Sequence, residues 1–131
     1  MKQLLIISLS IVSLFSSCKT DTIESPSLSQ GQELKLLQKQ HANIVSLSES
    51  EECTSSNDWL FAPIGNKACG GPTGFIAYSQ NIDTVNFLQL VEDYTLAQKN
   101  YNKKWGAISD CSTPPSPKRI ICKNGVAVFV Y

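Results

Sequence analysis

Apolar side chains recur at helical spacing in two stretches of this chain. After Glu33, and again between Asp83 and Gly106, they return mostly at steps of three and four residues, which places them on one face of a helix. We therefore predict an amphipathic helix from Glu33 to the polar stretch before Cys53. A longer helix is predicted to begin at Asp83 or Thr84 as its N-cap and to end at Gly106, because these residue types cap helices. The predicted apolar faces carry Leu34, Leu37, His41, Ile44 and Val45 in the first helix, and Phe87, Val91, Tyr94, Tyr101 and Trp105 in the second.

Shorter apolar runs predict strands. Residues 59–62 and 75–78 are rich in aromatic side chains, and glycine and proline bound both runs. This composition is typical of strands that end in turns. Together with the two helices, these runs predict an α+β fold in which two helices pack on a small, mainly antiparallel sheet.

The C-terminal segment predicts a β-hairpin. Runs 119–123 and 126–130 flank Asn124-Gly125, a pair typical of a tight type I′ turn. In a two-residue register, the predicted core face carries Ile120, Cys122, Ala127 and Phe129. The opposite face is also largely apolar, so we expect part of the hairpin to be covered on both faces.

The first seventeen residues have the pattern of an export signal. Met1 and Lys2 precede an apolar run that is shorter than the roughly 20 residues of a membrane-spanning helix. The run ends in Leu14-Phe15-Ser16-Ser17-Cys18, which resembles the lipobox of bacterial lipoproteins. The resemblance implies cleavage before Cys18 and acylation of that cysteine. The alternative is an ordinary secretory signal cleaved near Ser17.

These features divide the chain into three parts. Residues 1–17 are predicted to be a signal peptide, residues 18–31 a lipidated N-terminus and flexible tether, and residues 32–131 a single domain. The acyl chains on Cys18 would attach this domain to a membrane. Because Lys19 follows the cysteine, where an aspartate would resemble an inner-membrane retention signal, we expect delivery to the outer membrane.

Four further cysteines predict two disulfides, since an even number in a short exported chain indicates an oxidising compartment. These cysteines are Cys53, Cys69, Cys111 and Cys122. Three pairings are possible. Short loops favour Cys53 with Cys69 and Cys111 with Cys122, each worth roughly 3 kcal/mol. A zinc site is the alternative, but its ligands normally come in closely spaced pairs, which are absent here.

Charge and motifs exclude several functions. Eleven basic residues balance eleven acidic ones, so we expect no nucleic-acid partner. The segment 65–71 lacks the lysine and hydroxyl residue of a phosphate-binding loop. Glu49, Glu51 and Glu52 lack calcium-loop spacing and are expected to form a solvated helix end. His41, the single histidine, is expected to pack or snorkel. We therefore predict no catalytic residues, no metal and no cofactor.

A proline-rich segment is the candidate binding loop. It lies between Cys111 and Cys122, and the predicted disulfide would close it into a stiff loop that loses little entropy on binding. The candidate binding residues are Pro114, Pro115, Pro117 and Lys118. Such a loop is similar to the disulfide-closed loops of small protease inhibitors. The alternative is a constrained connection from the long helix to the hairpin.

The body of the chain also resembles a known group. The segments Lys67-Ala68-Cys69-Gly70-Gly71-Pro72 and Ser109-Asp110-Cys111, with the closing Cys-x-Asn-Gly turn, resemble small disulfide-containing exported bacterial proteins and lipoproteins without an established activity. We predict a lipid-anchored, non-catalytic binding or interaction module of the cell envelope, with an envelope protein or glycan as its partner. The alternatives are an inhibitor of a secreted hydrolase, such as a protease or lysozyme, and an envelope hydrolase.

Overall fold

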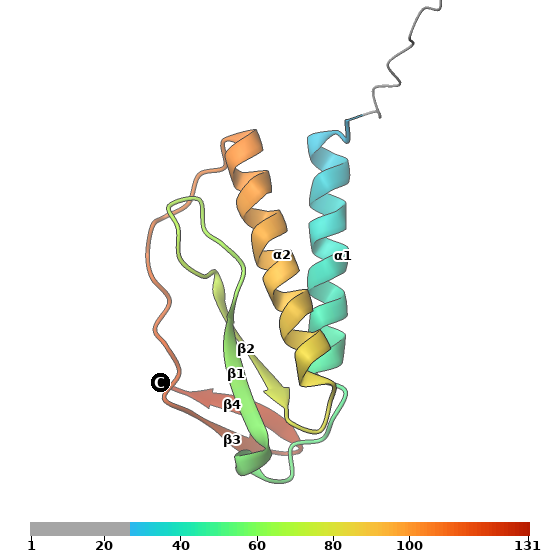
Figure 1. Ribbon diagram of the computed structural model, residues 1–131. Helices are drawn as coiled ribbons and strands as arrows, with labels where there is room; N and C mark the ends of the chain where they lie inside the picture. The colour runs from blue at the N-terminus through green and yellow to red at the C-terminus, as the bar shows by residue number, and fades with distance from the viewer. Residues whose placement is uncertain (1–26) are drawn as a thin grey trace, which may run out of the picture.

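The computed structural model describes residues 27–131, so the predicted signal peptide and Cys18 lie outside the described residues. The predicted α+β class is confirmed. Within this part of the chain, no helix is long and apolar enough to cross a membrane. The elements in chain order are α1 (Gln30–Ser48), the 3₁₀ helix η1 (Ser56–Asp58), β1 (Trp59–Ile64), β2 (Gly74–Ser79), α2 (Thr84–Trp105), β3 (Arg119–Lys123) and β4 (Val126–Val130) (Figure 1).

The elements form three layers. The antiparallel helices α1 and α2 cover one face of the β1–β2 hairpin, and the β3–β4 hairpin packs across the other face (Figure 1). The two hairpins are separate two-stranded antiparallel sheets, where the sequence predicts one sheet. The reason is that β1 and β2 are apolar on both faces: Ala62 and Ile76 pack toward the helices, and Phe61 and Ala77 toward the second hairpin.

Both helices begin at side-chain caps. Ser29 and Gln32 form a capping box, in which each side chain satisfies a backbone group of the other. Helix α1 therefore begins inside the predicted tether, three residues before Glu33. Asp83 accepts a hydrogen bond from the Asn86 N–H at 3.1 Å, and Gly106 ends α2 in the left-handed conformation, as predicted.

The helix periodicity locates the core correctly at most positions. Leu37 and Ile44 of α1 and Phe87, Val91 and Tyr94 of α2 are buried against the β1–β2 hairpin. Leu34 was predicted to face the core, but it stays 42% exposed. Tyr101 and Trp105, toward the end of α2, are half-buried.

The predicted C-terminal hairpin is confirmed. Asn124 and Gly125 both have positive φ angles, 53° and 79°, as a type I′ turn requires. Ile120 is buried in the predicted core face. The outer face, which pairs Ile121 with Val128, is exposed. Nothing within residues 27–131 covers it, so the predicted two-sided coverage is not found there.

The two disulfides join Cys53 to Cys122 and Cys69 to Cys111. Their predicted number is confirmed, and the predicted pairing of sequence neighbours is wrong. The Cys53 N–H donates to the Gly125 carbonyl oxygen at 2.8 Å, which holds Cys53 beside the C-terminal hairpin. The six residues of β1 then carry the chain away by about 20 Å before it reaches Cys69. Disulfide bonds are typical of exported proteins in oxidising compartments.

Candidate functional site

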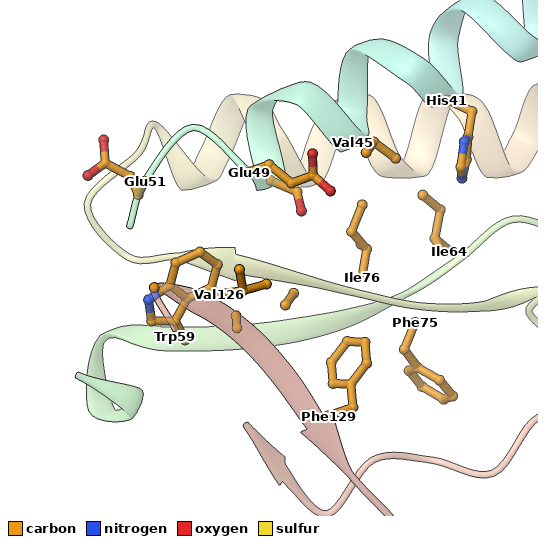
Figure 2. Close-up of a pocket in the computed structure, with 14 residues that line it drawn as sticks. His41, Val45, Glu49, Glu51, Trp59, Ile64, Phe75, Ile76, Val126 and Phe129 are labelled. Carbon is orange, nitrogen blue, oxygen red and sulfur yellow. The ribbon is translucent and has the colours of Figure 1, made fainter. Parts of the chain in front are cut away.

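A groove runs along β2, between the C-terminal half of α1 and strand β4 (Figure 2). Its volume is about 620 Å³, within the range of roughly 300–1,000 Å³ that is common for binding pockets. Three elements supply its apolar centre: Val45 lies on α1, Ile76 on β2 and Phe129 on β4. Figure 2 shows Val45 and Ile76 between α1 and β2, and the ring of Phe129 on the other side of β2, next to β4.

Aromatic packing fixes the wall of the groove on the β4 side. The rings of Phe61 and Phe129 meet edge to face with centroids 6.0 Å apart, and Phe61 contacts Phe75 in the same way at 6.1 Å. Such pairs add roughly 0.5–1.5 kcal/mol to the effect of burial. Phe75 and Phe129 both line the groove and remain half-buried, so part of each ring is available to a ligand.

One end of the groove is acidic. Glu49 is the C-cap of α1, and Glu49 and Glu51 both line the groove. The last turn of α1 carries no basic residue, so the partial negative charge of the helix C-terminus adds to these carboxylates. Glu52 lies beside Gly125 at the same end. The predicted solvated helix end is thus also the rim of a groove, and its charge favours a cationic ligand group.

His41 lies toward the opposite end. Its ring centroid is 5.4 Å from that of Tyr94, which agrees with the predicted packing role, while the rest of the side chain is exposed and lines the groove. No second histidine exists in the chain. Within residues 27–131, no group of three or more metal-ligating side chains is close enough to hold an ion.

The backbone of β2 has an open edge along the groove. The Gln80 N–H donates to the Asp58 carbonyl oxygen at 2.7 Å. In an antiparallel ladder, only every second residue of a strand bonds to its neighbour. Counted back from Gln80, the residues of β2 that bond to β1 are therefore Gly74, Ile76 and Tyr78. The N–H and C=O groups of Phe75, Ala77 and Ser79 point away from β1. Within the described residues, β2 pairs with β1 alone.

The glycine-rich segment after β1 forms a polar junction, which we define as Asn66, Lys67, Asp110 and Ser112 with the Cys69–Cys111 disulfide. The Lys67 ammonium donates to Asp110 at 2.8 Å and to the Ser112 carbonyl oxygen at 2.6 Å. The Asn66 N–H donates to the Gln98 side chain of α2. These bonds fasten the β1–β2 loop to α2 and to the chain that follows it. The Lys67–Pro72 and Ser109–Cys111 segments therefore have a structural role in holding this end of the fold.

The contact between Lys67 and Asp110 in the polar junction should be sensitive to acid. Hydrogen bonds from Lys67 and Ser112 lower the pKa of Asp110 from 3.8 to about 2. Because the folded state has the lower pKa, ionised Asp110 favours folding above about pH 4, and this contribution is lost as the pH falls through 2. An NMR titration of the Asp110 carboxyl carbon should therefore have its midpoint near pH 2. Lys67→Met should move it toward 3.8, whereas Lys99→Met on α2 should not. A wild-type midpoint near 3.8 would contradict the contact.

The proline segment differs from its predicted form. Cys111 and Cys122 belong to different disulfides, so no single bond closes the loop, and the likeness to disulfide-closed inhibitor loops loses its basis. Pro117 is buried and Pro114 is half-buried, while Pro115 and Lys118 are exposed. The Lys118 N–H donates to the Val130 carbonyl oxygen at 2.8 Å. The segment forms the connection from α2 to β3, which was the alternative interpretation.

Sequence reasoning did not find the groove. Its walls come from residues far apart in the chain, such as Val45, Ile76 and Phe129, and no local motif marks them. The only local signal was the acidic stretch after α1. Comparison with protein-family models, curated proteins and solved structures found no match for this chain.

Proposed function

We propose that this protein is a lipid-anchored, non-catalytic binding module of the cell envelope, held at the outer membrane through acylated Cys18. The observation that carries the binding role is the groove, which combines an apolar centre with an acidic end. The anchor is supported by the likeness of Leu14–Cys18 to a lipobox. The two disulfides support an exported location.

The geometry suits binding of a protein segment. Val45, Ile76 and Phe129 come from three elements, and the Cys53–Cys122 bond ties the chain after α1 to β3. A groove with walls fixed in this way loses little conformational entropy when a ligand enters. Nine of its fourteen lining residues are apolar. This favours an envelope protein as the partner over a glycan, which would need many hydrogen-bonding groups.

The anchor is tested by the intact mass of the protein extracted from membranes. We expect a chain that begins at Cys18 and carries acyl chains. The Cys18→Ala variant should lose this modification and leave the membrane fraction. An unmodified wild-type chain that fractionates with soluble exported proteins would contradict the anchor.

Site-specific crosslinking in intact cells tests the binding role. A photoreactive residue is placed at Val126 in the groove, at Pro115 in the proline segment, or at Val85, which is 80% exposed on α2. We expect one specific crosslinked protein from Val126 and none from Val85. Crosslinking from Pro115 alone would place the binding surface on the proline segment. The same products from all three positions as from an unrelated lipoprotein would contradict a binding role.

A further inference from the structure

We propose that the groove takes up an extended segment of a partner protein in which basic and apolar residues alternate, and that this segment adds to β2 as a third strand. The inference deepens the proposed binding function and rests on it. It identifies the partner's chemistry through three features of the groove: the unpaired edge of β2, the apolar wall of β4 and the acidic end of α1.

The edge of β2 is unprotected. Exposed strand edges invite pairing with another chain, and proteins usually block them with proline, charge or a covering element. Strand β1 carries Pro63, which lacks an N–H, at a position that faces away from β2. Strand β3 carries Arg119 and Lys123. The sequence of β2, Gly-Phe-Ile-Ala-Tyr-Ser, contains neither proline nor charge, so its free N–H and C=O groups are ready for a third strand.

The walls fit a strand in this position. Val45 of α1 lines one side of the groove, and Ala127 and Phe129 of β4 line the other, so an added strand would lie between α1 and β4 (Figure 2). Peptide-binding domains use the same arrangement, in which main-chain hydrogen bonds give affinity and alternate side chains give specificity. The groove is thus a site for an extended chain.

The two walls specify alternating side chains. The residues of the added strand that hydrogen-bond to Phe75 and Ala77 have their side chains on the same face of the sheet as these two. They face Ala127 and Phe129 of β4 and should therefore be apolar. The intervening residues face α1, where Glu49 is found. The groove lining contains Glu49 and Glu51 and neither lysine nor arginine. Lysine or arginine therefore fits the alternate position nearest Glu49 by charge. At the other alternate positions its apolar stem can cover Val45 while its charged end reaches solvent.

Titration calorimetry with designed peptides tests this inference on the domain with its disulfides intact. The probe is Lys-Val-Lys-Val-Lys-Val, blocked at both ends, and the charge control is Glu-Val-Glu-Val-Glu-Val. A third peptide is the probe with N-methylated valines, which keeps its charge but cannot donate from the residues that face β2. We expect the probe to bind, and N-methylation to weaken binding at least about tenfold through the lost hydrogen bonds. The Glu-Val peptide should not bind.

Matched variants distinguish binding of the probe in the groove from a general attraction of its positive charge to acidic residues on the surface of the domain. We expect Glu49→Gln with Glu51→Gln to weaken binding of the probe about fivefold at low salt, and the difference to shrink as salt is raised. Glu92→Gln with Asp93→Asn removes the same charge from an exposed part of α2 and should leave binding unchanged.

Three results would overturn the inference: no binding of the probe at 2 mM, equal binding of the N-methylated peptide, or equal binding of the Glu-Val peptide. Each leaves the proposed function open to its own test. A specific crosslink from Pro115 in cells, together with no binding of the probe, would retain the binding module and reject strand addition in the groove.

Discussion

Loss of the Cys53–Cys122 disulfide should destabilise the domain more than any surface change. This bond spans 69 residues, and the chain-entropy model assigns about 4 kcal/mol to a loop of that length. Cys53 is also only 3% exposed, packed with Trp59 and Ile120. Replacing both cysteines by alanine therefore adds the cost of a small cavity, about 1 kcal/mol. We expect Cys53→Ala with Cys122→Ala to lower the free energy of unfolding by about 5 kcal/mol in urea denaturation.

The second disulfide provides the matched control. It spans 42 residues, which gives nearly the same entropic value of about 4 kcal/mol, but Cys69 and Cys111 are exposed. Their double alanine variant should lose the smaller amount. Single variants test the pairing itself: Cys53→Ala should leave Cys122 open to alkylation and Cys69 protected. Alkylation of Cys69 in that variant would contradict the structure.

Truncation of Phe87 should give the other large effect. Its side chain is 1% exposed, and its ring centroid lies 5.0 Å from that of Tyr78 on β2. It therefore joins α2 to the β1–β2 hairpin at the centre of the core. We expect Phe87→Ala to lower the free energy of unfolding by about 3–5 kcal/mol, the usual cost of a buried phenylalanine cavity.

Val85 lies two residues earlier on the same helix and is 80% exposed. Val85→Ala should change the free energy of unfolding by less than about 0.5 kcal/mol, as is usual for surface positions. Both variants are compared with wild type by urea denaturation. A similar small change in the two variants would mean that Phe87 does not lie in the core.

The elements were predictable because their signals are local. Asp83 and Gly106 mark the ends of α2, and Asn124-Gly125 marks the hairpin turn, through backbone preferences that act within a few residues. The start of α1 was predicted three residues late, because Ser29 and Gln32 cap the helix before its apolar pattern begins.

The disulfide pairing and the groove were not predictable from local patterns. Cys53 meets Cys122 only after the second hairpin packs on the first. A preference for short loops considers only the distance along the sequence, so it does not include that packing. The same holds for the groove, where Glu49 and Phe129 meet across 80 residues of sequence. The sequence did contain a signal for the three layers, because both faces of 59–62 and 75–78 are apolar and a strand with two apolar faces is covered on both. This signal does not say which residues line the groove.

Amide hydrogen exchange measures directly whether β2 takes up a third strand. In the free domain, the N–H groups of Phe75 and Ala77 point into the groove and should exchange faster than that of Ile76, which bonds to β1. With the Lys-Val peptide at saturation, we expect exchange at Phe75 and Ala77 to slow at least about tenfold and Ile76 to change little. Unchanged exchange at both residues with the peptide bound would contradict strand addition to β2.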